Sequence, residues 1–363
     1  MIHIEKNCIP DNLKKTIICI YGGGYTGKVI INLFRRNGLI ISNIIDDDIG
    51  LQNSEVEGIK VISFDDFCRI YKNEEVSIVL TSIYGKAILR KIEKCQNIKI
   101  YELFDWYSEI IGNKEWIGKI TKDEDLFDLK QQWELIRKNL EDKESIDVLE
   151  GLWKYFNTKD LQYIEKICTD ADQYFIPEVI DSIKEPLHII DAGAYRGELL
   201  HSIKKNNLCL EKWYCFEPDE ENFTLLIEQE RKNEIRNVQT CIKKGLWNKE
   251  LKVFFEGGNS TGSRIVPYET KEYIEVISID EFIKTGRCNF IKMDIEGAEL
   301  EALKGGINTI KRERPILAIC IYHSLQDFWK IPQYLMEKLE EYSFFVRHHA
   351  LICNETVLYA IPK

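Results

Sequence analysis

Short apolar runs alternate with amphipathic stretches over the amino-terminal part of the chain. Runs rich in Ile and Val, bounded by turn or charged residues, predict strands over 16–22, 39–46, 76–84 and 97–103. Between them, the patterns over 27–38 and 85–97 predict helices, and the first would end at Gly38 as a C-cap. This alternation favours a small parallel α/β layer with crossover helices.

The strand signal disappears from about 112 to 184, where charged residues become frequent. Five apolar residues recur there at steps of three and four, which places them on one face of a helix: Leu126, Leu129, Trp133, Ile136 and Leu140. We predict a helical connector that packs on the chain's own domains. The alternative is that this stripe pairs with a second copy in a homodimer, although two heptads are too few to indicate a coiled coil.

After Pro186 the alternation of strands and helices resumes. Strands are predicted over 187–191, 212–217, 237–245, 289–295 and 315–323, and helices over 219–232 and 297–311. The tail over 344–362 has two β-rich runs around a polar turn, which predicts an antiparallel hairpin that closes the sheet. We therefore expect an α/β protein with domains at 1–112 and 185–363, joined by a helical connector at 113–184.

Composition narrows the classes of function. A chain of 363 residues exceeds what one core usually organises, and its 44% hydrophobic and 30% charged residues are typical of a globular protein. A net charge of -11 opposes binding to nucleic acid, so small or neutral ligands are the expected partners. No apolar run approaches the length of a membrane span, and the scattered cysteines without a CxxC pair predict reduced thiols in the cytoplasm.

The first glycine-rich loop, in "IICIYGGGYTGK", fits a dinucleotide-binding pattern. Gly22, Gly24 and Gly27 follow a predicted strand and precede a predicted helix, where glycines let a pyrophosphate approach the helix amino terminus. Asp46 follows at the end of the next strand, where an acid could hold ribose hydroxyls. The alternative is that these glycines only permit close packing of the strand and the helix.

The second glycine-rich loop, in "LHIIDAGAYRGE", differs in its acids. Asp191 ends the strand, Gly193 and Gly197 open the turn, and Glu217 ends the next strand. The first acid could accept from an ammonium group, and the second could take both hydroxyls of a ribose. A short loop of this kind suits an adenosine that carries an amino acid, which is the arrangement of an S-adenosylmethionine site.

The motifs that follow "DAGAYRGE" carry a family resemblance. Together with "CFEPDEENF", "VISIDEF", "FIKMDIEGAELEALKGG" and "RPILAICIYH", they resemble the FkbM family of S-adenosylmethionine-dependent methyltransferases, from about Ala171 to the carboxyl terminus. The resemblance implies a class I methyltransferase fold, with a mostly parallel seven-stranded sheet whose last strand is reversed. It also implies direct methyl transfer, commonly to hydroxyl groups of sugars or natural products.

The resemblance also implies roles for individual residues. Four of them would line the methionine end of the cofactor: Asp191, Gly193, Ala194 and Gly197. Glu217 would hold the ribose, and Leu246, just beyond the third strand, would cover the adenine.

The amino-terminal domain is similar to a different group of proteins. Over about 16–103, "YGGGYTGKVIINLFRRNGLIISNIIDDDIG" and "VEGIKVISFDDF" resemble the Rossmann-like module of sugar-modifying enzymes such as bacterial sugar acetyltransferases. In such modules the glycine loop and the aspartate-rich turn lie near nucleotide-linked sugars. Asp46 to Asp48 would then be a ribose ligand or a turn that caps the domain.

Two residues at strand ends are candidates for activating an acceptor hydroxyl. Asp294 ends "FIKMD" and His323 ends "LAICIYH", so both reach the same edge if these strands are neighbours. We expect His323 to be the general base, because its unperturbed pKa of about 6.5 leaves it neutral near pH 7. Asp294 would orient it or the substrate.

Other interpretations of these residues stay open. His323 could be a satisfied histidine at a strand end, and Asp294 could cap the helix that opens near Gly297. Asp294, Glu296 and His323 could bind a divalent metal, but no ligand spacing requires one, so we expect none.

The interpretation we favour is an enzyme of the cytoplasm that uses S-adenosyl-L-methionine to O-methylate a sugar, a nucleotide-activated sugar or a polysaccharide-type acceptor. Two alternatives remain. One is an NAD(P)-dependent sugar-nucleotide oxidoreductase centred on Gly22–Gly27. The other is a binding protein without activity, in which both glycine loops only support packing.

Overall fold

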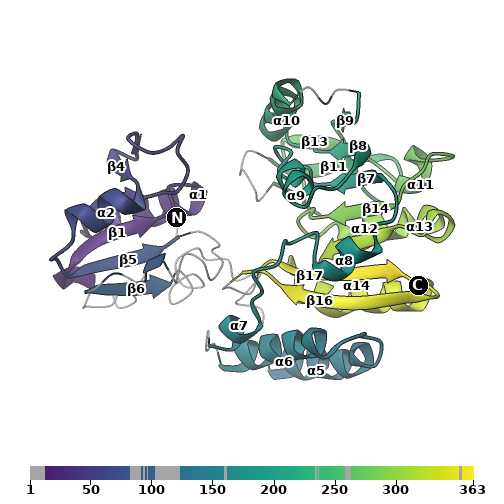
Figure 1. Ribbon diagram of the computed structural model, residues 1–363, viewed down its shortest axis with the longest axis horizontal. Coiled ribbons are helices and arrows are strands. Elements are labelled where there is room, and N and C mark those ends of the chain that lie inside the picture. The colour runs from purple at the N-terminus through teal and green to yellow at the C-terminus, as the bar shows by residue number, and fades with distance from the viewer. Residues whose placement is uncertain are drawn as a thin grey trace. The chain divides into compact units, whose positions relative to one another are not determined.

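The chain divides into two compact units, Met1–Thr121 and Lys122–Lys363, each with its own sheet (Figure 1). The computed structural model describes residues 13–81, 91–92, 95, 97–102, 123–158, 162–233, 235, 237–257, 263–350 and 354–363. Among these residues, none of the helices has the length and hydropathy that crossing a membrane would require.

The first unit is built on a six-stranded sheet. Its strands are β1 (Ile17–Tyr21), β2 (Ile41–Ile45), β3 (Glu55–Val56), β4 (Ile59–Ile62), β5 (Val76–Leu80) and β6 (Ile98–Glu102). They lie in the order β3-β4-β2-β1-β5-β6, and all neighbours are parallel except β3 and β4. Every residue of β5 is buried, as expected for a parallel strand inside a layered α/β unit. The predicted parallel layer is therefore present.

In the described part of the first unit, the helices with assigned bounds are η1 (Leu13–Lys15), α1 (Tyr25–Arg36) and α2 (Phe64–Ile70). The pattern over 27–38 predicted α1. The sequence did not predict α2 or the β3–β4 hairpin, because these elements are too short to show a clear period. A local signal for α2 does exist, since the Ser63 side chain accepts a hydrogen bond from the Asp66 backbone N–H at 3.1 Å as an N-cap. The helix predicted over 85–97 lies largely outside the described residues.

The second unit contains a seven-stranded sheet. Its strands are β7 (Leu187–Ala192), β8 (Leu210–Phe216), β9 (Gln239–Ile242), β14 (Phe290–Met293), β15 (Ile316–Cys320), β16 (Tyr342–His348) and β17 (Thr356–Pro362). They lie in the order β16-β17-β15-β14-β7-β8-β9. Only β17 runs antiparallel to both of its neighbours. This confirms the expected sheet with its last strand reversed, and the carboxyl-terminal hairpin adds to it with β17 inserted between β15 and β16.

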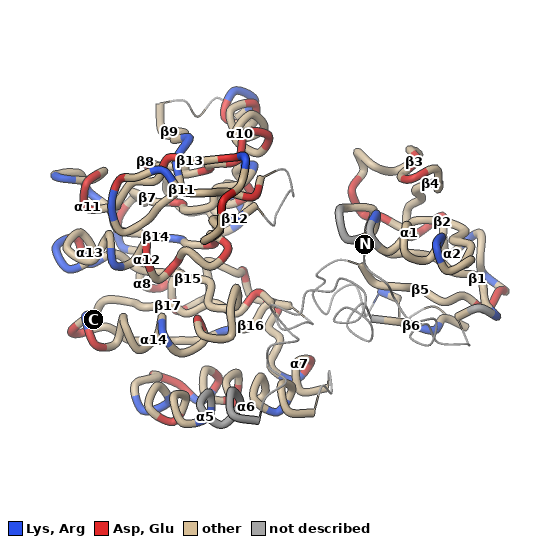
Figure 2. Tube along the Cα trace, turned by 180° about the vertical axis from the view of Figure 1, so that it is seen from behind, with Lys and Arg blue, Asp and Glu red and all other residues tan. Residues whose placement is uncertain are grey.

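The helices of the second unit cover this sheet, and some of them pack beside its edge strand β16. They are α5 (Asp123–Arg137), α6 (Lys143–Thr158), α7 (Gln162–Ile167), α8 (Pro177–Ser182), α9 (Leu199–Lys205), α10 (Glu220–Lys232), α11 (Ile279–Phe282), α12 (Glu299–Lys304), α13 (Ile307–Glu313) and α14 (Asp327–Lys338). Both views place α6 beside β16, and α5 packs against α6 and α14 (Figures 1 and 2).

Helices α5 to α8 lie within the predicted connector of 113–184 and pack on the second unit. On the predicted stripe, Trp133 and Ile136 are buried, and the Trp133 ring packs edge-on against Phe328 of α14. The side chains of Leu126 and Leu129 lie outside the described part. Arg347 of β16 is buried and binds Asp142, just before α6, at 2.5 Å and Glu178 of α8 at 2.6 Å. Two helices of the connector are therefore tied to the sheet by charge.

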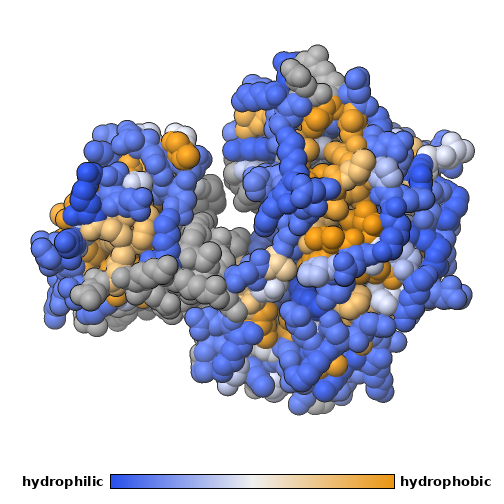
Figure 3. Space-filling view, in the orientation of Figure 1, coloured by the Kyte–Doolittle hydropathy of each residue, from blue (hydrophilic) through white to orange (hydrophobic). Residues whose placement is uncertain are grey.

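A second, smaller sheet follows β9 and was not predicted. Its strands are β10 (Gly245–Leu246), β11 (Leu251–Glu256), β12 (Arg264–Ile265) and β13 (Glu272–Ile277), in the order β10-β13-β11-β12. Hydrophobic positions alternate in "EYIEVI", so β13 did carry a strand signal. The aromatic rings of Tyr268 and Tyr273 are exposed, and Figure 3 shows hydrophobic side chains gathered in a band on one face of the second unit.

Candidate functional site at the edge of the seven-stranded sheet

The carboxyl ends of four adjacent parallel strands meet at one edge of the seven-stranded sheet. In the order β15-β14-β7-β8, the chain passes from β7 outward to β8 on one side and to β14 on the other. Ligands of open α/β sheets bind at such a switch point, beyond the strand ends. The structure brings Asp191, Glu217 and Asp294 to this edge, as the sequence predicted.

The loop after β7 has glycines where other residues do not fit. Gly193 has φ +72°, and a Cβ atom there would lie 1.9 Å from the backbone oxygen of Asp294. Gly197 has φ +84°, and its Cβ would lie 2.2 Å from the Gln229 side chain. The backbone N–H groups of Gly193 and Ala194 both donate to the Phe216 oxygen at 3.0 Å. These contacts hold the loop between the ends of β8 and β14.

Asp191 lies in β7, buried beneath this loop, and does not face solvent. Its buried carboxylate lies 3.1 Å from the Lys292 ammonium, and it accepts a hydrogen bond from the Trp213 indole at 3.1 Å. Lys292 in turn donates to the Gly193 backbone oxygen at 2.6 Å. Burial by itself would lower the pKa of Lys292, but the charges of Asp191 and Asp294 outweigh it and raise the pKa above its ordinary value. Lys292 therefore stays charged and fastens the glycine loop. That Asp191 itself lines the methionine end stays a prediction.

Glu217 lies just beyond β8 with its carboxylate held by the backbone. One oxygen accepts from the Tyr195 N–H and the other from the Asp219 N–H, both at 2.9 Å. Burial raises the pKa of Glu217 to about 7, although these two bonds oppose the shift. A carboxylate offers about four acceptor positions. Two remain for a pair of vicinal hydroxyls, so the side chain is suited to the ribose role predicted for it.

Asp294 is the centre of a hydrogen-bond network just beyond β14. The hydroxyl of Tyr174 donates to one carboxylate oxygen at 2.9 Å, and that of Tyr322 donates to the other at 3.1 Å. The latter oxygen also lies 3.2 Å from His323 Nε2. Burial alone would raise the pKa of Asp294, but the His323 contact and the Lys292 charge hold it below its ordinary range. Asp294 does not cap the following helix, because α12 has Ala298 at its N-cap with no side-chain bond.

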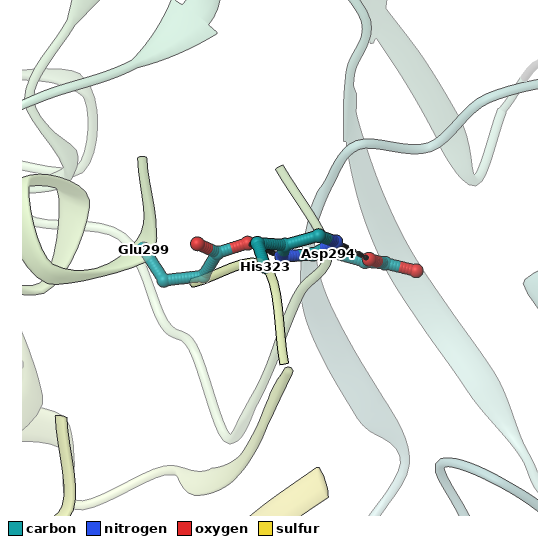
Figure 4. A group of neighbouring side chains, drawn as sticks. All are labelled: Asp294, Glu299 and His323. Carbon is teal, nitrogen blue, oxygen red and sulfur yellow. Dashed lines mark ion pairs between the residues drawn. The ribbon is translucent and has the colours of Figure 1, made fainter. Parts of the chain in front are cut away.

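His323 lies between two carboxylates (Figure 4). Its Nδ1 atom is 2.8 Å from Glu299 Oε1, on the side opposite to Asp294. Burial would lower the pKa of His323, but the charges of Glu299 and Glu296 and the contact with Asp294 raise it well above the ordinary value. These charges favour the protonated imidazole, which argues against the neutral ring expected near pH 7. The role of His323 as the general base stays a prediction.

The side chains of Asp294, Glu299 and His323 offer ligand atoms within 4.8 Å of one another, which a metal ion could use, so Glu299 takes the place that the sequence suggested for Glu296. In the structure, the buried Glu299 accepts from the backbone N–H groups of Ile295 at 2.8 Å and Gly297 at 3.0 Å. The cluster thus has the donors and charges of an ion-pair network that fixes the loop after β14.

Several residues of this network were not assigned from the sequence. Tyr174 and Tyr322 reach Asp294 from segments far away in the chain, and no periodic pattern signals such contacts. Lys292 lies inside β14, and no local pattern in the sequence indicates that it pairs with Asp191. Leu246, predicted to cover the adenine, is buried in β10, where it pairs with Ile277 of β13.

The first unit also brings its predicted residues together. Gly27 must be glycine for packing, because a Cβ there would lie 2.1 Å from the Gly22 oxygen. A Cβ on Gly24 would meet nothing within 4 Å, so the loop is open at that point. Asp46 accepts from the Gly23 N–H at 2.7 Å and from the Asp48 N–H at 2.9 Å, as a residue that caps the turn would. Its role as a ribose ligand stays a prediction.

Comparison with known proteins identifies the part of the chain that holds the edge of the seven-stranded sheet. Residues 191–348 match the family model of the methyltransferase FkbM domain. The second unit thus contains an FkbM methyltransferase domain, and a domain of this family implies S-adenosylmethionine as the methyl donor. The searched set of curated proteins contains no significant match to the chain.

Among solved structures, methyltransferase FkbM from Methylobacillus flagellatus KT is similar to this chain over nearly its whole length. The match has a TM-score of 0.60 and 22% identity, and covers 98% of this chain and 94% of that one. It supports the fold. An rRNA-methylase described as putative from Clostridium thermocellum and an rRNA methylase from Streptococcus thermophilus each match at 14% identity and a TM-score of 0.34. They cover 51% of this chain and 91% and 90% of their own.

Proposed function

We propose that the FkbM methyltransferase domain transfers a methyl group from S-adenosylmethionine to a hydroxyl oxygen of a sugar, a nucleotide-activated sugar or a polysaccharide. The observation that carries the proposal is the meeting of Glu217, the glycine loop fastened by Lys292 and the acidic loop after β14 at one sheet edge. When bound, S-adenosylmethionine supplies a methyl group already activated on a sulfonium sulfur, so the protein mainly has to align it.

The residues at this edge suit such a cofactor in two ways. Glu217 has acceptor positions left for the ribose hydroxyls, and its carboxylate is oriented by the Tyr195 and Asp219 amides. Acidic side chains surround the loops after β7 and β14, including Glu198 and Glu296, whose pKa values are raised by burial. A ligand with ammonium and sulfonium charges would be stabilised there. Its positive charges would lower the pKa values of these carboxyl groups, which would then release protons to the solvent.

We further propose that the first unit holds the acceptor through a nucleotide diphosphate. The open space at Gly24 and the amino terminus of α1 behind it support this role, because a phosphate can approach the free N–H groups of a helix end. The oxidoreductase alternative would use the same loop for NAD(P), with Asp46 on the ribose. Calorimetric titration with NAD(P) separates the two, since tight binding that depends on Asp46 would favour the oxidoreductase.

The acceptor is tested by incubating the protein with labelled S-adenosylmethionine and a panel of nucleotide sugars and glycans. We expect label in one class of acceptor, and mass analysis of the product to place the methyl group on oxygen. Glu217→Ala should lose cofactor binding, whereas Glu269→Ala, on the exposed surface, should retain it. Methylation of nitrogen or of a non-sugar acceptor would overturn the proposed substrate class, and failure of S-adenosylmethionine to bind would overturn the activity.

A further inference from the structure

His323 and Asp294, which the sequence suggested for proton transfer, form an ion pair in which each stabilises the charge of the other. The carboxylate of Asp294 already receives hydrogen bonds from Tyr174 and Tyr322 and lies beside His323. Its pKa lies below the ordinary range because, despite burial, His323 and Lys292 stabilise its charged form. A carboxylate with such a low pKa is a weak base, because general-base efficiency rises as the pKa approaches the working pH.

His323 is also unsuitable as the proton acceptor. Its side chain is only 5% exposed, and its two ring nitrogens face Glu299 at 2.8 Å and Asp294 at 3.2 Å. A histidine that carries a proton between two carboxylates has no lone pair to offer. Its place in the structure is to fix Asp294 and the loop after β14.

Glu296 is the most exposed of the three carboxylates in this loop, although it is still partly buried. Its side chain is 31% exposed, and its nearest cationic atom, His323 Nε2, is 3.7 Å away, beyond hydrogen-bond distance. Within the described part of the chain, no donor hydrogen-bonds its carboxylate. The backbone holds it in an unusual conformation, with φ +55° at Glu296 and φ +95° at Gly297. Such left-handed residues other than glycine are costly and are concentrated at functional sites.

The charges around Glu296 come from four segments. His323 follows β15, Asp294 follows β14, Glu299 begins α12, and Arg264 lies in β12 of the small sheet. Burial, together with the carboxylates of Asp294 and Glu299, raises the pKa of Glu296 to about 7, while His323 and Arg264 oppose the shift. A carboxyl group with this pKa exchanges protons readily near neutral pH.

We propose that Glu296, and not His323 or Asp294, removes the proton from the acceptor hydroxyl. The inference rests on the proposed methyl transfer. The acceptor oxygen forms a bond to the methyl carbon, the bond between that carbon and the sulfonium sulfur breaks, and the electron pair stays on sulfur. The hydroxyl proton passes to the Glu296 carboxylate, which later returns it to water. The products are the methyl ether and neutral S-adenosylhomocysteine.

The test compares Glu296→Gln with Glu269→Gln, the same chemical change on an exposed segment. With the acceptor found in the screen, Glu296→Gln should lower turnover by about 100-fold or more, the usual range for a general base, and should weaken cofactor affinity by a much smaller factor. The kcat/KM for S-adenosylmethionine of the unchanged protein, which reports the pKa of the free enzyme, should rise with pH through about 7, and that rise should be absent from the residual activity of Glu296→Gln. Turnover of Glu296→Gln above a tenth of the original value would overturn the inference.

A second readout does not depend on the acceptor. A sulfonium bound beside Glu296 should lower the pKa of that carboxyl and release a fraction of a proton at pH 7. Calorimetry of S-adenosylmethionine binding in buffers with different ionisation enthalpies measures this release, which should be smaller in Glu296→Gln than in Glu269→Gln. Equal proton release in both variants would show that Glu296 is not beside the reacting group. Absence of cofactor binding in every variant would instead refute the methyltransferase activity on which the inference rests.

Discussion

The buried pair of Asp191 and Lys292 gives a prediction with a definite magnitude. In Lys292→Met, the Asp191 carboxylate would stay fully buried, with the Trp213 indole as its remaining hydrogen-bond partner among the described residues, and the Gly193 oxygen would lose its 2.6 Å hydrogen bond. Removing one partner of a buried ion pair costs about 3–5 kcal/mol because an uncompensated charge remains. The free energy of unfolding of a domain is only about 5–15 kcal/mol, so about a fifth or more would be lost.

Urea denaturation followed by tryptophan emission measures this loss. The matched control is Lys304→Met, because Lys304 also contacts a carboxylate, Glu301, at 2.6 Å, but its side chain is 43% exposed. An exposed pair contributes up to about 1 kcal/mol. The double variant Asp191→Asn/Lys292→Met should recover part of the stability lost in Lys292→Met, because both charges are gone. Equal costs for Lys292→Met and Lys304→Met, or strictly additive costs in the double variant, would refute a desolvated pair.

Three further predictions follow from the same geometry. Burial raises the pKa of Glu217 from 4.5 to about 7, so the folded state holds more protons than the unfolded state in this range, and stability should fall as pH rises from about 5 to 7. Denaturation at several pH values measures this slope, which should be shallower in Glu217→Gln. An unchanged slope would contradict the assignment. Gly193→Ala should weaken S-adenosylmethionine binding, measured by calorimetry, at least about tenfold. The new Cβ would lie 1.9 Å from a backbone oxygen, and an αL conformation costs a residue other than glycine about 1–2 kcal/mol. Gly24→Val, where a Cβ meets open space, should leave S-adenosylmethionine binding intact. Trp133→Ala should lower the free energy of unfolding by about 3–5 kcal/mol because the ring is buried against Phe328. The control is Leu135→Ala on the same helix, which should cost under about 0.5 kcal/mol because Leu135 is 57% exposed. Similar costs for the two variants would mean that α5 does not depend on the contact with Phe328.

Local sequence was sufficient for the sheet and for the residues at its edge. Apolar runs of the right length gave the strands, and an acid or glycine directly after such a run must lie at the carboxyl edge of a parallel sheet. Asp191, Glu217 and Asp294 were found in this way. The small sheet was missed although β13 alternates, because β10 and β12 have only two residues each and give no period.

Contacts between distant segments could not be predicted from local patterns. Tyr174 approaches Asp294 from before α8, and Tyr322 approaches it from beyond β15. The buried ion pair of Asp191 and Lys292 depends on the register of β7 against β14, which places these two residues opposite each other. Register between parallel strands is decided by the packing of the whole layer.

The sequence by itself determined which chemical groups reach the site, and the tertiary structure decided their protonation. A histidine at a strand end has a pKa of about 6.5 as an isolated side chain, which made His323 the natural base. In the folded chain, three carboxylates of the segment from the end of β14 to the first residue of α12 surround that ring and favour its protonated form, while burial raises the pKa of Glu296 to about 7. Protonation follows from desolvation and from charges a few ångströms away, and only folding sets those distances.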